Sequence, residues 1–320
     1  MQNQTMKVLF VASGNKNGEP GAVVKNQADT LKKAGIQVDF YLIRGKGLKG
    51  YLRNVYPLCK YLKKAETGVI HSHYSLSALV TSMALFLGRK RPHVVSLMGS
   101  DAKIKGIIKT LVKICHTSLW DKTIVKSHQM AVESGLENTD VIPNGVDIKK
   151  IEAIDNNLKK SDTQGRVDQT KNTVLFAADP SRESKNYPLA DKAVRRSSGK
   201  SKVIYDQPHE TVLAELLKAD VLLLTSRWEG SPNLVKEAMA CNCPVVSTNV
   251  GDVEWLFGDE PGHFLTTFDP EDVAQKIDQA LEFSRAHGRT QGRDRILALG
   301  LDAENVAERL VGVYGEALER

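Results

Sequence analysis

Short apolar runs recur along the first half of the chain, and amphipathic stretches separate them. The run Lys7 to Ala12 leads through a glycine-bearing loop to residues 22–34, whose apolar positions repeat at helical spacing up to Gly35. Gln37 to Ile43 is the next apolar run. This order of strand, glycine loop, helix and strand predicts a βαβ unit with parallel strands and a right-handed crossover. Further strands are predicted at 69–74, 93–97, 123–125 and 140–143.

A second series of strands follows a polar stretch. Residues 155–172 contain almost no bulky apolar side chain, which is typical of a domain boundary. Apolar runs then alternate with helical segments, with strands predicted at 173–177, 202–205, 221–224 and 245–246. The chain from Pro270 onwards is predicted to be helical, with periodic apolar positions at Val306, Leu310, Val313, Tyr314 and Ala317. Because 320 residues are many for one core, we expect two α/β domains with parallel sheets.

The segment 225–248 joins two of these strands and holds the most specific chemistry. Glu229 lies in the polar loop after the first strand, Ser231 is expected to cap the next helix, and Pro232 fits its first position. Glu237 falls about a turn and a half into that helix. A helix N-terminus presents unpaired N–H groups and a partial positive charge, which favour a phosphate. Two carboxylates beside a phosphate site fit a nucleotide sugar, which has hydroxyls at both ends.

Polar side chains also end two predicted strands of the first half. His73 and Asp101 each follow an apolar run, and the carboxyl ends of strands are where open α/β sheets bind ligands. A lone histidine in this position is more often structural, so only its pairing with Asp101 favours a catalytic role. The loop 13–21 lacks the Gly-x-Gly-x-x-Gly spacing of dinucleotide sites. It is better explained as a loop that lets a substrate approach the backbone.

The net charge of +6 hides an asymmetry between the halves. Residues 1–150 contain 23 Lys or Arg against 10 Asp or Glu, a net of +13, and the remaining residues contain 21 against 28, a net of −7. The basic half either faces an anionic partner or carries lysines that are simply solvated. The Lys-rich segment 102–126 is likewise either a helix on an anionic membrane surface or an ordinary domain helix with a solvated lysine face. Its expected helical face comprises Ile104, Ile107, Ile108, Leu111, Val112 and Cys115.

Targeting and redox signals are sparse. No apolar run approaches the eighteen or so residues of a membrane span, and the first residues lack the layout of a signal peptide. We therefore expect a cytoplasmic protein. The four cysteines fit reduced thiols, since no histidine neighbours the pair Cys241 and Cys243 at zinc-site spacing.

With these residues in view, the chain resembles a retaining glycosyltransferase of family 4. The segment EGSPNLVKEAMACNCPVV, with Glu229 and Glu237, matches the E-x7-E motif of that family. The glycine loop, VIHSHYS, MGSD, PNGVD and Gly251-Asp252 match as well, so the resemblance covers most of the chain. It implies the GT-B fold, with Rossmann-like domains at 1–157 and 158–304 whose parallel sheets face across a cleft. The C-terminal helix, about 305–320, is expected to pack back on the first domain.

The resemblance also implies roles for particular residues. Catalytic roles fall to His73 near the donor sugar, Arg182 and Lys185 on the departing diphosphate, and Glu229 on the sugar hydroxyls. The implied donor-binding residues are Gly18, Gly21, Ser231, Pro232, Asn233, Leu234 and Glu237, the last on the ribose. Asp101 would help to seat the acceptor. No cofactor and no metal are expected, because the chain has no Asp-x-Asp pair and a basic pair with a helix N-terminus can stabilise the leaving group instead.

The expected activity is therefore the transfer of a sugar from a nucleotide-sugar donor, with retention, to a lipid-linked or cell-envelope glycan. A peripheral position on an anionic membrane is a possible consequence of the basic half, and no nucleic-acid partner is expected. Two alternatives stay open: a catalytically silent partner that binds a nucleotide sugar, and a sugar-nucleotide epimerase on the same fold.

Overall fold

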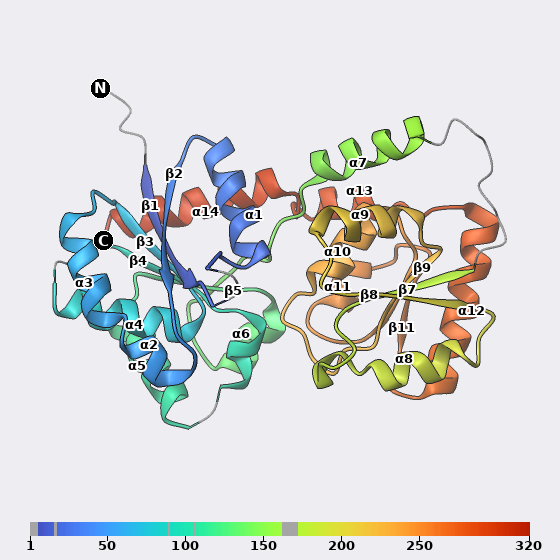
Figure 1. The fold of residues 1–320 in the computed structure, drawn as a ribbon, viewed down its shortest axis with the longest axis horizontal. Coiled ribbons are helices and arrows are strands. Elements are labelled where there is room, and N and C mark those ends of the chain that lie inside the picture. Colours follow the sequence, from blue (N-terminus) through green and yellow to red (C-terminus); the bar gives the residue numbers. More distant parts are fainter. Residues whose placement is uncertain (1–5, 16–17, 89, 105, 162–171) are drawn as a thin grey trace. The chain divides into compact units, whose positions relative to one another are not determined.

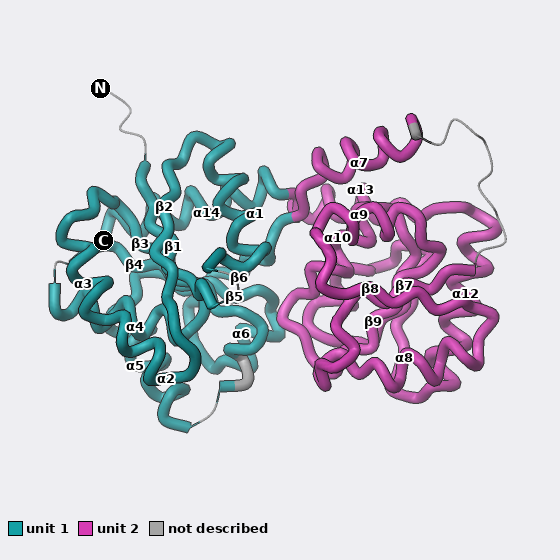
Figure 2. Tube along the Cα trace, in the orientation of Figure 1, with its two compact units in different colours: residues 1–145, 303–320 teal, residues 146–302 magenta. Residues whose placement is uncertain are grey.

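The computed structural model describes residues 6–15, 18–88, 90–104, 106–161 and 172–320 (Figure 1). The chain forms two compact units, which Figure 2 shows in different colours. Unit 1 comprises residues 1–145 and 303–320, and unit 2 comprises residues 146–302. Both are α/β units with a parallel sheet, as the alternating pattern predicted.

The sheet of unit 1 has the strand order β2-β1-β3-β4-β5-β6 in the described part of the chain, and every pairing in it is parallel. Its strands are β1 (Lys7–Ser13), β2 (Gln37–Ile43), β3 (Val69–His73), β4 (His93–Ser96), β5 (Lys122–Val125) and β6 (Asp140–Val141). The central strands β1, β3 and β4 are buried along most of their length because helices cover both sides of the sheet. The order reverses between β1 and β3, so the switch point lies where these two strands end.

Helices cover the two faces of this sheet with separate cores. On one face Val8 and Phe10 of β1 pack with α1 (Ala22–Lys33) and α14 (Ala303–Leu318). On the other face Leu9 and Val11 pack with α2 (Gly47–Leu52), α3 (Val55–Lys64) and α4 (Ser75–Phe86). The alternation along β1 follows from the two-residue period of a strand. The remaining helices are the 3-10 helix η1 (Gly99–Lys103), α5 (Ile107–Ser118) and α6 (His128–Ser134).

Unit 2 repeats this topology. Its strands are β7 (Thr173–Ala177), β8 (Lys200–Ile204), β9 (Val221–Leu224), β10 (Val245–Thr248) and β11 (His263–Thr266), in the parallel order β11-β10-β9-β7-β8. Its helices are α7 (Ile148–Ser161), η2 (Glu183–Lys185), α8 (Tyr187–Val194), α9 (His209–Lys218), α10 (Asn233–Ala240), α11 (Val253–Phe257), α12 (Pro270–His287) and α13 (Gly292–Ala298). The order reverses between β7 and β9, which sets a second switch point there.

The units part after Gly145, whereas the sequence placed the boundary after residue 157. Helix α7 accounts for the difference, because Ile148, Ile151 and Ile154 join the core of unit 2. The polar composition of 155–172 concealed this helix, which continues to Ser161; residues 162–171 lie outside the described residues.

The basic region 48–64 is helical and forms α2 and α3; Nδ2 of Asn54, between them, donates to the carbonyl of Gly50 at 2.8 Å. One helix prediction for unit 1 needs correction. The helix expected from residue 102 begins only at Ile107, since Gly106 has a left-handed φ of 65° that interrupts any earlier turn. Ile104 is therefore extended and not helical, and only Val112 and Cys115 of α5 are fully buried. Among the described residues, no helix is long and apolar enough to cross a membrane.

Candidate functional site

The switch point of unit 2 brings together two of the residues singled out in the sequence. Lys185 lies in the loop after β7, and Glu229 lies in the loop after β9. The Nζ atom of Lys185 donates to Oε1 of Glu229 at 2.5 Å, and the hydroxyl of Ser226 donates to the same oxygen at 2.8 Å. Both charged side chains are about four-fifths buried, at 18% and 19% exposure. A paired cation and anion therefore occupy the edge where this fold binds ligands.

Backbone bonds hold these two loops as one surface. The N–H of Arg227 donates to the carbonyl of Ser184 at 2.8 Å, and the hydroxyl of Thr225 donates to the carbonyl of Lys185 at 3.0 Å. Arg182 precedes η2, and its side chain is exposed. The N–H of Lys185 donates to the Arg182 carbonyl at 2.9 Å, so one turn presents both basic residues.

Helix α10 points its N-terminus at this same edge. The helix begins at Asn233 with Pro232 at the N-cap and no side-chain cap, so the expected capping by Ser231 is wrong. Ser231 is 9% exposed, and its hydroxyl has no partner among the described residues. The first turn of a helix has N–H groups that no helical carbonyl accepts, and here Leu234 is half-buried on that turn. An anion placed there would find both the N–H groups and the Ser231 hydroxyl.

Glu237 has a partner that sequence reasoning missed. Its Oε1 lies 2.9 Å from Nε2 of His209, the first residue of α9. The contact could not be predicted from the sequence, because it depends on the packing of α9 against α10 and no motif links the two positions. The histidine fixes the direction of the Glu237 carboxylate.

A buried lysine lies next to Glu237. Lys236 is completely buried in α10, and burial lowers its pKa to about 8 although Asp252 and Glu237 oppose the shift. Asp252 follows Gly251, whose left-handed backbone packs so tightly that a Cβ there would lie 2.7 Å from the carbonyl oxygen of Gly230. Only glycine fits this contact, which supports the loop that carries Glu229.

His73 ends β3 at the switch point of unit 1. It is 4% exposed, its ring stacks on His71 at 4.2 Å, and its Nε2 has no partner among the described residues. Burial and then Lys126 lower its pKa to about 3, so the ring is neutral. Tyr74, the next residue, has a φ of 80°, a rare value for a residue with a side chain. A neutral histidine at a strand end, with a strained residue next to it and one ring nitrogen without a partner in the described part of the chain, is a fitting hydrogen-bond partner for a substrate hydroxyl.

The glycine loop of unit 1 leaves its backbone open. A Cβ at Gly18 or Gly21 would meet nothing within 4 Å, and Gly21 is the residue that precedes α1. Lys16 and Asn17 of the same loop lie outside the described residues. The loop follows β1, so it leaves the sheet at the same switch point as His73.

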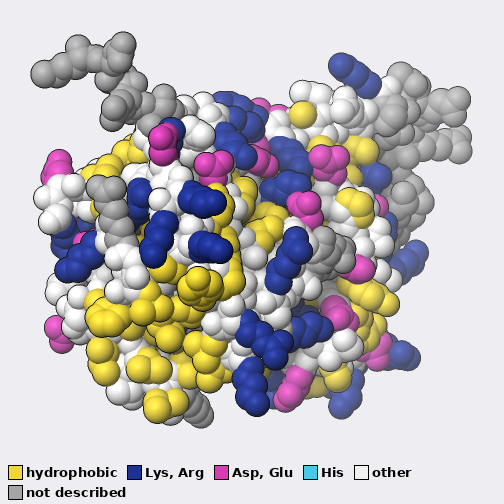
Figure 3. Space-filling view, turned by 60° about the vertical axis from the view of Figure 1, so that its left-hand side comes forward, with side chains coloured by type: hydrophobic (Ala, Val, Ile, Leu, Met, Phe, Trp, Pro, Cys, Tyr) yellow, Lys and Arg dark blue, Asp and Glu magenta, His cyan; other side chains and the backbone are white. Residues whose placement is uncertain are grey.

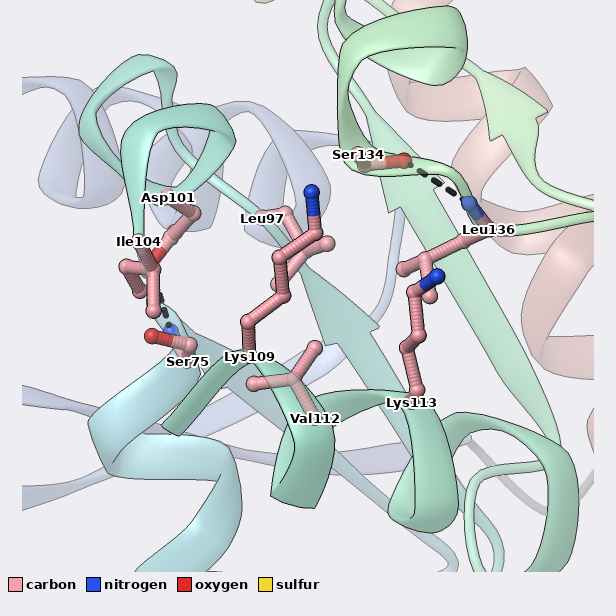
Figure 4. Close-up of a pocket in the computed structure, with 9 residues that line it drawn as sticks. All are labelled: Ser75, Leu97, Asp101, Ile104, Lys109, Val112, Lys113, Ser134 and Leu136. Carbon is pink, nitrogen blue, oxygen red and sulfur yellow. Dashed lines mark hydrogen bonds between the residues drawn. The ribbon is translucent and has the colours of Figure 1, made fainter. Parts of the chain in front are cut away.

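Asp101 is held by the backbone. Its Oδ2 accepts the N–H of Met98 at 2.6 Å, and its Oδ1 accepts the N–H of Ser75 at 3.2 Å, which ties η1 to the start of α4. Burial raises its pKa to about 6. It lines a small pocket together with Lys109 and Lys113, which extend in the same direction from α5 in Figure 4. The pocket leaves about 20 Å³, enough for one water and too little for a sugar ring. Seating an acceptor therefore stays a prediction for Asp101.

Two units with parallel α/β sheets form the GT-B fold. Residues 164–282 match the family model described as Glycosyl transferases group 1, and this segment contains Arg182, Lys185, Glu229 and Glu237. The resemblance to glycosyltransferases is thereby confirmed, while family 4 in particular stays a prediction.

One curated relative and two solved structures show the extent of the likeness. The protein TuaC of Bacillus subtilis (strain 168), named as a teichuronic acid biosynthesis glycosyltransferase, is 24% identical over 217 residues, which are 59% of this chain and 55% of TuaC. The chain thus spans about half the length of that relative. Sucrose-phosphate synthase from Thermosynechococcus elongatus has a TM-score of 0.74 at 19% identity, covering 98% of this chain and 99% of its own. Anabaena HepE, in complex with UDP and glucose, has a TM-score of 0.75 at 17% identity over 97% and 99%. Both structures confirm the predicted GT-B fold.

Proposed function

We propose that this chain is a retaining glycosyltransferase that takes a sugar from a nucleotide-sugar donor. The observation that supports it best is the Lys185–Glu229 pair beside the N-terminus of α10, at the switch point of unit 2. The lysine and the helix N-terminus suit a diphosphate, and the carboxylate suits sugar hydroxyls. The nucleotide in HepE is UDP, so a uridine diphosphate sugar is the first donor to test.

Each residue of the site takes a role in this proposal. When the glycosidic bond to the diphosphate breaks, negative charge grows on the leaving phosphate. Arg182, Lys185 and the first turn of α10 neutralise that charge without a metal ion. The carboxylate of Glu237, which His209 holds in position, accepts hydrogen bonds from the ribose hydroxyls. The acceptor attacks from the face that the diphosphate leaves, and a phosphate oxygen takes its proton, which retains the configuration of the sugar.

Unit 1 is proposed to bind the acceptor. Asp101, which its hydrogen bond to the N–H of Ser75 ties to the start of α4, is the residue proposed to seat it. The open glycine loop with Gly18 and Gly21 keeps its proposed donor-binding role, and the Nε2 of His73, which has no partner in the described part of the chain, is proposed to contact the donor sugar. We propose a lipid-linked or cell-envelope glycan as the acceptor, because the first half of the chain is strongly basic and TuaC is named for a cell-wall polymer. The proposal includes a cytoplasmic protein at the inner face of a membrane, with no nucleic-acid partner.

Donor turnover tests the proposal. Arg182→Ala and Glu237→Gln should each lower the release of nucleoside diphosphate from the true donor by about a hundredfold or more. The first substitution removes a positive charge from the leaving phosphate, and the second removes the carboxylate that holds the ribose. A panel of UDP, GDP and ADP sugars with a coupled diphosphate assay provides the measurement. Arg195→Ala is the matched control, since Arg195 pairs with Asp191 on the surface of unit 2 and should leave turnover unchanged.

Other outcomes would contradict the proposal. Unchanged turnover in both variants would remove the switch point of unit 2 as the donor site. Thermal stabilisation by a nucleotide sugar without turnover on any acceptor would indicate a silent binding partner. An isomerised sugar nucleotide in the absence of acceptor would indicate an epimerase.

A further inference from the structure

Helix α4 is unusual for a helix that is partly on the surface. Its twelve residues, SLSALVTSMALF, include no charged side chain. One face packs in the core of unit 1 through Val80 and Ala84, but Phe86 is 84% exposed and Met83 and Leu87 are exposed beside it. A helix that is apolar on all sides is normally buried, so this exposed side needs a covering environment.

The neighbouring helices extend the same feature. Helices α2 and α5 both pack against α4. Leu48 and Leu52 are exposed on α2, one turn apart, and Ile107, at 75% exposure, begins a stripe on α5 at the spacing of i, i+4 and i+7. The resulting apolar face of unit 1 comprises Leu48, Leu52, Met83, Phe86, Leu87, Ile107, Leu111 and Ile114. Figure 3 shows hydrophobic side chains gathered in one broad area of this unit, with Lys and Arg side chains beside it.

The apolar face is larger than a soluble surface normally carries. Each of its side chains is at least 41% exposed. With about 150–200 Å² for a whole large side chain, the face exposes on the order of 800 Å². The largest apolar patch of a typical monomer is roughly 300–600 Å², and larger ones mark protein or membrane contacts.

The charges around these helices identify the partner. Between Arg44 and Lys113 the sequence contains fourteen Lys or Arg and two acidic residues, Glu66 and Asp101. Asp101 is buried with both oxygens on backbone N–H groups, and Glu66 pairs with Lys7 at 3.4 Å. The helices that form the apolar face have no acidic residue at all. A second copy of the chain would bring the same positive charges together, whereas an anionic bilayer would attract them.

We propose that the apolar face of unit 1 docks on an anionic lipid bilayer. The leucines, isoleucines and Phe86 enter the acyl boundary, and exposed lysines at α2, such as Lys46 and Lys49, extend their charged ends to lipid headgroups. This inference deepens the proposed peripheral position and names the surface responsible, but it does not require sugar transfer. It differs from a membrane role for the Lys-rich segment 102–126 alone, because three helices contribute.

Vesicle flotation tests the docking without any donor or acceptor. The full chain should float with vesicles of phosphatidylcholine and phosphatidylglycerol, and only weakly with phosphatidylcholine alone. Raising the salt concentration should weaken the binding severalfold, since exposed charges are screened. The double variant Phe86→Ser/Ile107→Ser should bind the mixed vesicles at least about tenfold more weakly than the wild type, because two side chains no longer enter the apolar boundary.

Phe268→Ser is the matched control, because Phe268 is an aromatic residue of unit 2 with 55% exposure. It should float like the wild type. Urea unfolding of each variant checks that the substitutions leave the fold intact. Equal flotation of wild type and double variant, or no flotation of the wild type, would overturn the proposal. So would a wild-type dimer in sedimentation that the double variant loses, because a second copy would then cover the face. Flotation with no donor turnover would leave this inference standing while the proposed function failed.

Discussion

Lys185 and Glu229 show how much a single contact adds to a sequence motif. The sequence assigned Lys185 to the diphosphate and Glu229 to the sugar, with no relation between them. In the structure they pair at 2.5 Å, and both are largely buried. A donor that binds as proposed must therefore replace or share this contact. The pair holds the lysine side chain in position before a donor arrives, and the Glu229 carboxylate competes with phosphate for it.

This competition gives a prediction for the two residues. Lys185→Met should weaken the binding of UDP or another matching nucleoside diphosphate by about tenfold to a hundredfold, because a charge-assisted hydrogen bond is lost. Glu229→Gln should leave diphosphate binding unchanged or tighter, because it frees the lysine, but should weaken binding of the complete nucleotide sugar. Calorimetric titration of both ligands on both variants measures this crossover. Weaker diphosphate binding in Glu229→Gln would show that the pair acts as one unit and not as competitors.

At the scale of single elements, the strands were the most predictable part. Val221–Leu224 was predicted to the residue, because a strand buried on both faces is a continuous apolar run between polar turns. Helix starts were less predictable. Ser231 looked like an N-cap and is not, and the beginning of α5 depends on the backbone of Gly106. Helix α7 was hidden by its polar exposed side, since only three isoleucines show which way it faces.

Helix α14 illustrates what periodicity leaves out. Its apolar spacing predicted a buried face, and Tyr314 belonged to that face as one more apolar position. In the structure the Tyr314 hydroxyl lies 2.7 Å from Nδ1 of His71, and both residues are completely buried. His71 in turn stacks on His73. The C-terminal helix therefore supports the histidine at the end of β3, and no local pattern connects residues 71 and 314.

Removing that hydroxyl should have a measurable cost. Tyr314→Phe keeps the packing but leaves a buried ring nitrogen of His71 unpaired, so the free energy of unfolding should fall by about 1–3 kcal/mol. Tyr205→Phe, which alters an exposed tyrosine of unit 2, should change it by less than about 0.5 kcal/mol. Urea unfolding measures both. A loss for Tyr314→Phe as small as that of the control would mean that His71 finds another partner.

At the scale of the whole molecule, the two units share a topology but bury different chemistry. Unit 1 holds His71, His73 and His93 at or below 4% exposure. His71 is hydrogen-bonded to Tyr314 and Ser96, and His93 is hydrogen-bonded to Ser72. Burial lowers the pKa of His73 and His93 to about 3 and that of His71 well below its usual value. Lys126, also buried, depresses the pKa of His71 and His73 further. In unit 2 the half-buried His263 has a pKa that burial lowers to about 4.

These differences predict that acid destabilises unit 1 first. Because the folded pKa of each buried histidine is below the unfolded value of about 6.5, the unfolded chain binds more protons as the pH falls, and stability is lost below pH 6.5. Asp101 acts in the opposite direction between about pH 6 and 4, since its folded pKa is raised. Between pH 7 and 5, the three histidines, partly offset by Asp101, lower the free energy of unfolding of unit 1 by roughly 4 kcal/mol, and His263 lowers that of unit 2 by roughly 2 kcal/mol.

Pulsed hydrogen exchange along a urea series at both pH values measures the stability of each unit separately. His93→Gln should reduce the pH slope of unit 1 alone, with the exposed His128→Gln as control, and equal slopes in both units would contradict the assignment.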